Sequence, residues 1–307
     1  MQFTTIFLTR HGELRAGWRL LLFVLITSCI GFLIAAPFLV FKIATSFLVT
    51  LLALMASLLG SFVMTRYINK KPFAAIGFSI HPGTFREVGM GLLLGFLMMT
   101  GIFLVEFGTG HAVIEWRGLG IWDILWMIVS AAVFFLVAAV LEEVLFRGYL
   151  FQTMMQAITF LPATVLMAVL FAAAHMYNPN ASTYGIINVG LAAVWLSFAY
   201  LKTRSLWLPC GLHFSWNFTQ TSIYGFPTTG AAFADKTVVH LTQSGPEWIT
   251  GGAFGPEGGV LATLALIFCT WYILKSRLLE APEGIITLDS VEDLVPPGQQ
   301  KSGEATT

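Results

Sequence analysis

Long apolar runs are the feature that most limits how this chain can fold. Eight stretches approach the roughly 20 apolar residues that a helix needs to cross a membrane. They lie at about 20–41, 45–65, 88–106, 121–141, 161–176, 184–201, 205–224 and 258–275. Only 10% of the 307 residues are charged, whereas soluble domains carry about 25%. The sequence therefore predicts an all-α, polytopic transmembrane helical bundle of about eight spans.

Composition divides the chain into three parts. Residues 1–19 precede the first span, residues 20–280 hold all the spans, and residues 281–307 are acidic, polar and contain proline. This last composition predicts a disordered tail. A short helix at about 142–157 is expected to continue from the fourth span. The sequence contains no internal repeat and no second soluble domain.

The distribution of arginine and lysine predicts the orientation of the bundle. With eight spans, most of these residues fall on one side, and positively charged loops face the cytoplasm. They are Arg10, Arg15, Arg19, Arg66, Lys70, Lys71, Arg86, Lys202, Arg204, Lys275 and Arg277. We therefore expect an integral protein of the bacterial cell (inner) membrane with both termini in the cytoplasm. The loop at about 225–259 is expected on the outer side.

Three ionisable residues stand at the end of the apolar fourth span, where each of them suggests a function. Glu142 and Glu143 are adjacent, so they point about 100° apart around a helix. Arg147 follows Glu143 by four residues, which is the spacing and order of a helical ion pair. Glu142 has no charged partner on its own helix face, so we expect it to find one on another span.

Two later spans carry further polar groups. His175 lies near the end of the fifth span, and His213 and Asn217, four residues apart, share one face of the seventh. Each could be a structural hydrogen-bonding group if it stood alone. The remaining ionisable residues considered lie at span ends or in loops and are expected on the solvated surface. They are Glu106, His11, His81, His111 and His240.

Together these groups can hydrolyse a peptide bond with water. A carboxylate next to a histidine, such as Glu142 with His175, can hold and deprotonate a water. His213 and Asn217 can donate hydrogen bonds to the oxyanion of a tetrahedral intermediate. A water-filled cavity among the central helices would keep these groups polar at membrane depth. We therefore expect the active site in such a cavity.

A zinc ion is the alternative to this metal-free chemistry. Glu142, His175 and His213 are zinc ligands by type. The HExxH arrangement is absent, however, and the two glutamates are adjacent instead of being spaced for shared ligation. No cofactor is therefore favoured, and a zinc-dependent mechanism stays open as the alternative.

Three motifs in this order resemble the CPBP family, which comprises the type II CAAX prenyl endopeptidases and the bacterial Abi/bacteriocin-processing proteins. EEVLFR, FAAAH and HFSWN match the family pattern EExxxR, FxxxH and HxxxN. The resemblance covers about 120–224 well and implies an eight-helix intramembrane protease. It implies that water is activated by Glu142 and His175. It further implies an oxyanion hole formed by His213 and Asn217, and support from Glu143 and Arg147.

The resemblance also implies a peptide or protein substrate, which could be lipidated or membrane-embedded. The formal net charge of zero gives no argument for a nucleic-acid partner. Three alternatives stay open: a metal-dependent form of the same protease, a proton-coupled membrane carrier, and a non-catalytic immunity or scaffold protein. Intramembrane Glu and His also serve as proton relays, but many carriers show related halves and this sequence does not.

Overall fold

The computed structural model describes residues 4–9, 12–43, 45–233 and 237–288. Its α-helices are α1 (Thr4–Phe7), α2 (Ala16–Val40), α3 (Ser46–Val63), α4 (Thr84–Gly108), α5 (Ile121–Glu143), α6 (Phe151–Ile158), α7 (Phe160–Ala174), α8 (Thr183–Thr203), α9 (Trp207–Phe218), α10 (Glu247–Thr250) and α11 (Val260–Lys275). Shorter π and 3₁₀ helices are η1 (Met64–Ile68), η2 (Phe73–Ile76), η3 (Val144–Leu150), η4 (Thr219–Ile223), η6 (Gly252–Phe254) and η7 (Pro256–Gly258). Strands β1 (Ala112–Trp116) and β2 (Val239–Gln243) form one antiparallel ribbon. The expected all-α bundle is confirmed.

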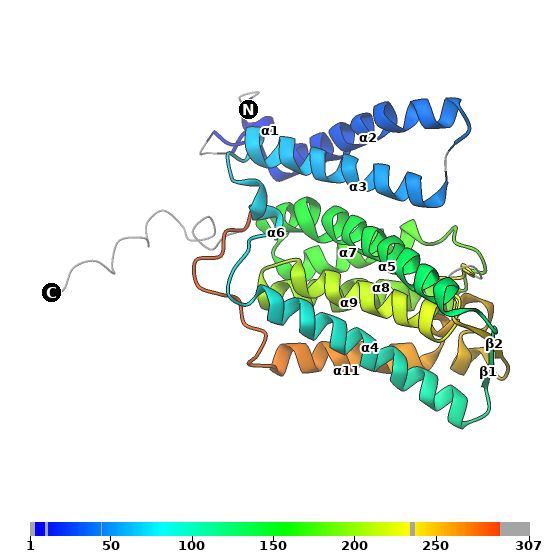
Figure 1. Ribbon diagram of the computed structural model, residues 1–307. Helices are drawn as coiled ribbons and strands as arrows, with labels where there is room; N and C mark the ends of the chain where they lie inside the picture. The colour runs from blue at the N-terminus through cyan, green and yellow to red at the C-terminus, as the bar shows by residue number, and fades with distance from the viewer. Residues whose placement is uncertain (1–3, 10–11, 44, 234–236, 289–307) are drawn as a thin grey trace.

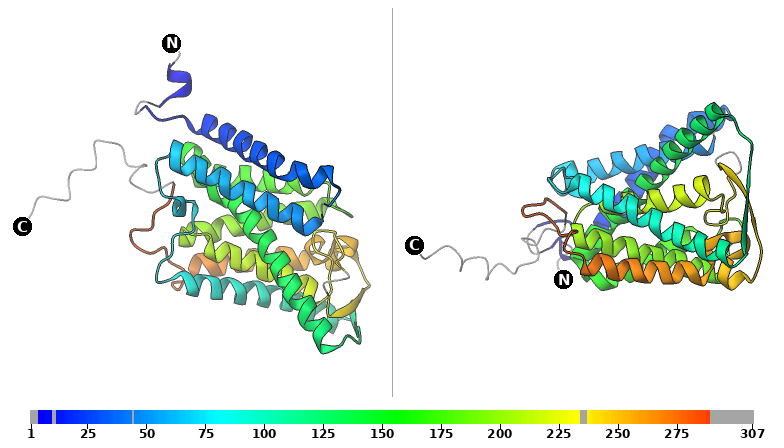
Figure 2. Two further views of the ribbon diagram at one scale, coloured as in Figure 1. Left: turned by 45° about the horizontal axis from the view of Figure 1, so that its top comes forward. Right: turned by 60° about the horizontal axis from the view of Figure 1, so that its bottom comes forward.

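The helices lie roughly side by side (Figure 1). The α2–α3 hairpin forms one edge of the bundle and α4 with α11 forms the other, with α5, α7, α8 and α9 between them. Both views in Figure 2 show this layering from other directions. The β1–β2 ribbon covers one end, opposite the end that holds α1 and the described C-terminal segment. The helices that carry the three motifs therefore lie between these two edges, and α5 and α7 also have an exposed side, as at Trp126 (75%) and Val165 (63%).

Helices occupy all eight expected positions, but fewer of them have the length of a full span. Among the described residues, five helical segments are long and apolar enough to cross a membrane: Ala16–Val40, Ser46–Ile68, Thr84–Gly108, Ile121–Ile158 and Thr183–Thr203. The apolar helices α7 and α11 are shorter, and α9 continues only through the π-turn η4. Two of these shorter helices carry polar motif residues. His175 directly follows α7, and His213 and Asn217 lie within α9.

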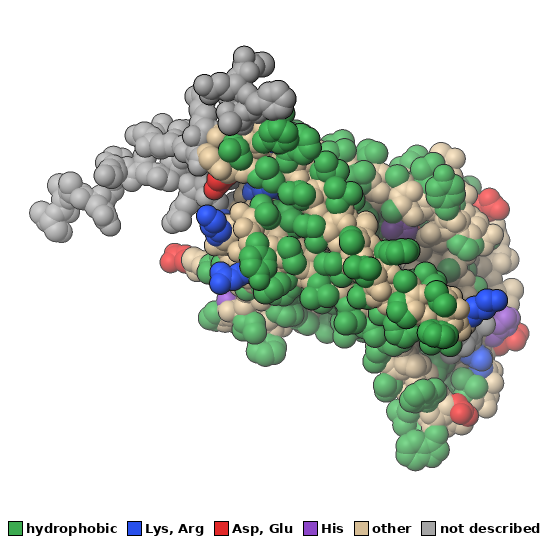
Figure 3. Space-filling view, turned by 90° about the horizontal axis from the view of Figure 1, so that it is seen from above, with side chains coloured by type: hydrophobic (Ala, Val, Ile, Leu, Met, Phe, Trp, Pro, Cys, Tyr) green, Lys and Arg blue, Asp and Glu red, His purple; other side chains and the backbone are tan. Residues whose placement is uncertain are grey.

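The surface fits a protein embedded in a membrane. In Figure 3 hydrophobic side chains cover the middle of the face seen from above, and the charged side chains gather toward the two ends. Large apolar residues such as Phe32 (69% exposed) and Leu33 (64%) on α2 face outward. In water such a continuous apolar surface would promote aggregation. The apolar surface and the five long apolar helices together indicate an integral membrane protein.

Two glycines on α4 let α9 approach closely. A Cβ at Gly91 would lie 2.8 Å from the Leu208 carbonyl oxygen, and one at Gly95 would lie 2.7 Å from that of Leu212. Small residues at four-residue spacing allow such close packing of membrane helices. The α4 helix thereby fixes the position of the helix that carries His213 and Asn217.

Glu106 does not lie on the solvated surface, which corrects the expectation from the sequence. Its side chain, near the end of α4, is fully buried, and its Oε2 accepts a hydrogen bond from Gln243 Nε2 at 2.7 Å. The reason is that β2 folds back over the end of α4. The same expectation is wrong for His81, whose side chain is 9% exposed and whose Nε2 lies 3.3 Å from Glu87 Oε1. Of the other histidines in this group, His111 is half-buried, His240 is exposed, and His11 lies outside the described residues.

The first part of the expected tail is packed against the bundle, which corrects its boundary. Leu288 is fully buried, and its backbone N–H donates to Gln152 Oε1 at 2.8 Å. Lys71 Nζ donates to the carbonyl oxygens of Thr287 (3.1 Å) and Leu288 (3.2 Å). The acidic composition of the whole tail conceals a short apolar stretch that can be buried. Residues 289–307 lie outside the described residues.

Replacing Leu288 with alanine should lower the thermal stability of the protein. Burial of this side chain is lost, and buried Leu→Ala substitutions cost about 2–5 kcal/mol. We expect the lower part of that range, because a terminal segment can shift to fill part of the space. The measurement is thermal unfolding in detergent, with Ile286→Ala as the control at a neighbouring residue that is 49% exposed. Identical melting of the two variants would contradict the prediction.

Candidate active site

The two adjacent acids stand where helix α5 changes its winding. After Glu143 the chain enters the π-helix η3, in which Gly148 has a non-helical ψ of −110°, and it continues as α6. This confirms that a helical segment continues from the fourth span. Single π-turns inside helices are frequent at functional sites. The acids therefore lie immediately before a kink in an otherwise regular span.

The ion pair expected between Glu143 and Arg147 is present and completely buried. Arg147 Nη1 donates to Glu143 Oε1 at 3.2 Å, and both side chains are 0% exposed. The same Oε1 lies 2.7 Å from His213 Nδ1. Spacing along one helix could not predict this second contact, because His213 belongs to α9. Glu143 therefore orients the His213 ring as well as the Arg147 guanidinium.

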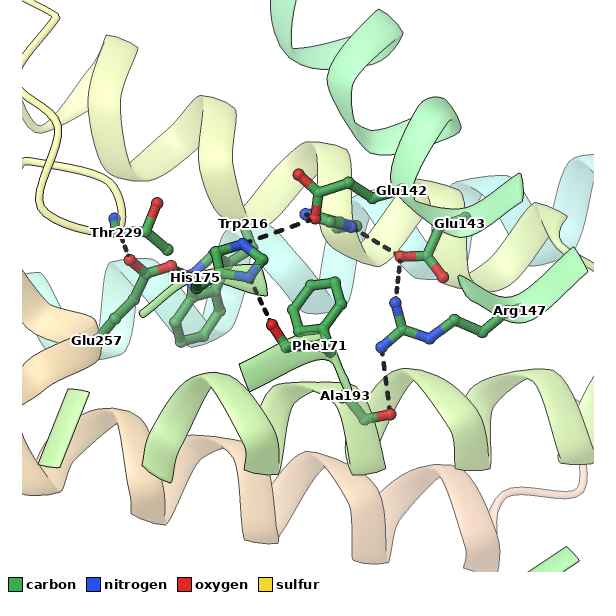
Figure 4. A network of polar contacts seen from close by, with 10 residues as sticks. Glu142, Glu143, Arg147, Phe171, His175, Ala193, Trp216, Thr229 and Glu257 are labelled. Carbon is green, nitrogen blue, oxygen red and sulfur yellow. Dashed lines mark hydrogen bonds and ion pairs between the residues drawn. The ribbon is translucent and has the colours of Figure 1, made fainter. Parts of the chain in front are cut away.

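Arg147 connects the acids to two further helices. Its Nη2 donates to the carbonyl oxygen of Ala193 on α8 at 3.2 Å. Its guanidinium carbon lies 4.7 Å from the centre of the Phe171 ring on α7, a cation–π contact. Figure 4 shows this chain of contacts running from the acids to α8. The guanidinium thus contacts residues of α5, α7 and α8 and links these three helices beside the acids.

Glu142 faces two histidines from other helices, as its lack of a partner on its own helix predicted. Its Oε2 lies 4.0 Å from His175 Nε2 and 3.7 Å from His213 Nε2. Both distances exceed those of direct hydrogen bonds, and this oxygen makes no hydrogen bond to any described residue. His175 Nδ1 lies 2.7 Å from the Phe171 carbonyl oxygen. When Nδ1 carries the proton and donates there, Nε2 faces Glu142 as an acceptor.

These residues border a single cavity of about 60 Å³. One water needs roughly 10–15 Å³ of such space, so several waters fit. The cavity is lined by Glu142, Phe171, His175, Asn188, Val189, Ala192, Trp195, Leu196, His213, Trp216, Asn217, Thr229, Glu257, Ala262 and Leu266. The structure thus brings Glu142, His175, His213 and Asn217 together around this cavity. Glu143 and Arg147 are not part of its lining.

The cavity also contains polar residues that the sequence motifs do not include. Glu257, in η7, accepts hydrogen bonds from Trp216 Nε1 at 3.0 Å and from the Thr229 backbone N–H at 2.5 Å. Burial raises the pKa of its carboxyl, and the hydrogen bond from Thr229 opposes that rise. Glu257 belongs to the 225–259 loop, which the sequence left without a role. A lone acid among glycines directly before the last span is the signal that could have indicated it.

Three of the residues around the cavity, Glu142, His175 and His213, are of the types that bind zinc. Within the described part of the chain, no group of three or more His, Cys, Asp or Glu side chains forms a metal-binding cluster. Nε2 of His175 and of His213 nevertheless faces Glu142 Oε2, and both Nδ1 atoms are engaged by oxygen atoms. That is the usual support of metal-bound histidines. The residues therefore fit zinc by type.

The comparisons with known proteins agree with the position of the motifs. Residues 124–219 match the family model of the Type II CAAX prenyl endopeptidase Rce1-like proteins, and this segment includes all three motifs. The chain is 22% identical over 234 residues to the protein YyaK of Bacillus subtilis (strain 168), described as uncharacterized, with 71% of this chain and 72% of that protein covered. No solved structure matches the chain. The resemblance seen in the sequence is confirmed over the segment that carries the motifs.

Proposed function

We propose that this chain, in which residues 124–219 are Rce1-like, is an intramembrane endopeptidase that cleaves peptide bonds with water. The observation that carries the proposal is the convergence of Glu142, His175 and His213 from three helices on one cavity, which Asn217 also borders. A carrier also uses intramembrane acids and histidines, but the family match favours a peptidase.

In this proposal Glu142 is the general base. A water between Glu142 Oε2 and His175 Nε2 would bridge the 4.0 Å between these atoms with hydrogen bonds to both. Its oxygen attacks the carbonyl carbon of the scissile bond while its proton passes to Glu142. The proton then moves to the leaving nitrogen as the C–N bond breaks. The products are a carboxylic acid and an amine, and Glu142 is ionised again.

His213 and Asn217 are proposed to stabilise the oxyanion of the tetrahedral intermediate. The Asn217 amide makes no side-chain hydrogen bond to the described residues and borders the cavity, so it is available as a donor. The His213 Nδ1 is held by Glu143 at 2.7 Å, so the protonated ring would donate through Nε2. Donors aimed at the developing charge contribute strongly to catalysis. Glu143 and Arg147 act by fixing this geometry.

The substrate class follows from the location of the site. A cavity among membrane helices receives a peptide that is itself membrane-embedded or lipidated, so we propose a substrate of that kind. We further propose that the protein lies in the bacterial inner membrane with both termini in the cytoplasm, as the positive charges indicate.

A zinc-dependent form of the same reaction is the second candidate. Glu142, His175 and His213 would hold the ion, which would activate the water and polarise the carbonyl. The approach of both Nε2 atoms to Glu142 Oε2, at 4.0 Å and 3.7 Å, is the observation that favours it. In that form Asn217 would still serve as an oxyanion donor.

A cleavage assay with metal control tests the function. We expect purified protein in detergent to cleave quenched peptides, with and without a prenyl group, and to keep its activity after treatment with a chelator. Loss of activity with the chelator, restored by zinc and accompanied by bound zinc in metal analysis, would establish the second candidate instead. Absence of cleavage together with substrate-dependent proton flux in liposomes would contradict both and favour a carrier.

A further inference from the structure

Glu257 joins three segments that surround the cavity. Its two carboxylate oxygens accept from Trp216 Nε1 on α9 and from the Thr229 N–H in the outer loop. Its backbone carbonyl oxygen accepts from Asn188 Nδ2 on α8 at 2.8 Å. Figure 4 shows Glu257 and Thr229 on the side of His175 away from Arg147. One residue outside the motifs therefore connects α8, α9 and the loop.

The chemistry of these contacts calls for a carboxylate. Trp216 Nε1 and the Thr229 backbone N–H both donate to this side chain, and a carboxylate offers a separate acceptor oxygen to each. Glu257 is 9% exposed, and within the described residues no Lys, Arg or His lies within ion-pair distance of it, although a charged His175 favours its ionised form and opposes the rise of its pKa. A buried carboxylate without a cation in direct contact is unfavourable. Its presence therefore indicates that the two hydrogen bonds serve a purpose that a neutral side chain would not meet.

The first of these hydrogen bonds anchors a side chain of α9. Trp216 immediately precedes Asn217 and follows His213 by three residues, so a rotation of α9 that moves its indole moves both proposed oxyanion donors. Its ring is almost completely buried and lies 5.9 Å from that of Trp195. The hydrogen bond to Glu257 fixes the polar edge of this ring.

The second hydrogen bond fixes the outer loop over the cavity. Next to Thr229, the Gly230 N–H donates to the Phe254 carbonyl oxygen at 2.8 Å, and Asn180 Nδ2 donates to the Gly230 carbonyl oxygen at 3.1 Å. Gly230 has a φ of +82°, and a Cβ there would clash with the Pro179 carbonyl oxygen. The loop thus lies directly on the α7–α8 connection.

We propose that Glu257 is a positioning residue of the catalytic cavity, which holds α9 through Trp216 and the outer loop through Thr229. Its effect on catalysis rests on the proposed peptidase function, whereas its effect on the loop does not. This gives the 225–259 loop a role as the outer wall of the site.

Mutant kinetics test the link through Trp216. We expect Glu257→Gln to lower kcat about 10²-fold, the size of effect that small misplacements can have, and to change KM less than twofold. Trp216→Phe keeps an aromatic ring but removes the N–H and should also lower kcat. Because the two residues act through one contact, the double variant should lose no more than the more damaging single variant. The control is Glu247→Gln, at an exposed acid in the same loop.

Hydrogen–deuterium exchange tests the link to the loop without using activity. Peptides covering 226–231 should exchange faster in Glu257→Gln than in the wild type and in Glu247→Gln. Unchanged kcat, or losses that multiply in the double variant, would overturn the positioning role, and unchanged exchange would overturn the loop contact. A wild type without any cleavage would instead refute the peptidase function, and the exchange result would still decide the contact. If Glu257→Gln does not fold, Trp216→Phe provides the kinetic measurement, and Glu257→Asp, whose shorter side chain draws the carboxylate away from the Thr229 N–H, provides the exchange measurement.

Discussion

Glu142→Gln should lower kcat for peptide cleavage by about 10²–10⁴-fold, the usual contribution of a general base. Glutamine has nearly the same size and can still hold a water, but its amide cannot accept the proton of that water. The folded structure should change little, because Glu142 Oε2 makes no direct hydrogen bond to the described residues and its side chain is 28% exposed. The variant should therefore melt at nearly the wild-type temperature while losing activity.

The same assay should show a comparable loss for His175→Ala, since His175 faces the same oxygen at 4.0 Å. Glu115→Gln provides a matched control, because Glu115 is an exposed acid on β1 and should keep full activity. Unchanged cleavage in both Glu142→Gln and His175→Ala would refute the glutamate mechanism. A loss that accompanies a large drop in melting temperature would instead assign these residues a structural role.

The separation of the two acids could be predicted because it depends only on helix geometry. Neighbouring residues point about 100° apart, and residues four apart lie together. The sequence therefore paired Glu143 with Arg147 and left Glu142 to find partners elsewhere, as the structure shows. The three motifs also predicted which helices would meet.

The contacts that the sequence did not predict join residues far apart in the chain. The Glu143–His213 and Glu257–Trp216 hydrogen bonds link different elements, and no periodicity within one element specifies them. The sequence misled in two other places, once through position at a span end and once through composition averaged over a segment. Glu106 is buried by a strand more than 130 residues later, and Leu288 is buried within a segment whose overall composition is acidic.

Glu143→Ala should lower the stability of the protein strongly, in contrast to Glu142→Gln. The substitution leaves Arg147 buried, with 0% of its side chain exposed and no carboxylate beside it. Breaking a buried ion pair by removing one partner costs about 3–5 kcal/mol. The His213 ring also loses the contact at 2.7 Å that orients it. We therefore expect a large drop in melting temperature, and a loss of activity that follows from it.

A double variant distinguishes this explanation from a general loss of packing. Glu143→Ala combined with Arg147→Met removes both charges and leaves an apolar side chain of similar length, so no unpaired charge stays buried. Replacing a buried ion pair by apolar residues is often neutral or stabilising, so the double variant should melt at a higher temperature than Glu143→Ala alone. Its activity should stay low, because His213 remains unsupported. Wild-type melting of Glu143→Ala, or a double variant less stable than the single one, would show that Glu143 does not act by neutralising Arg147.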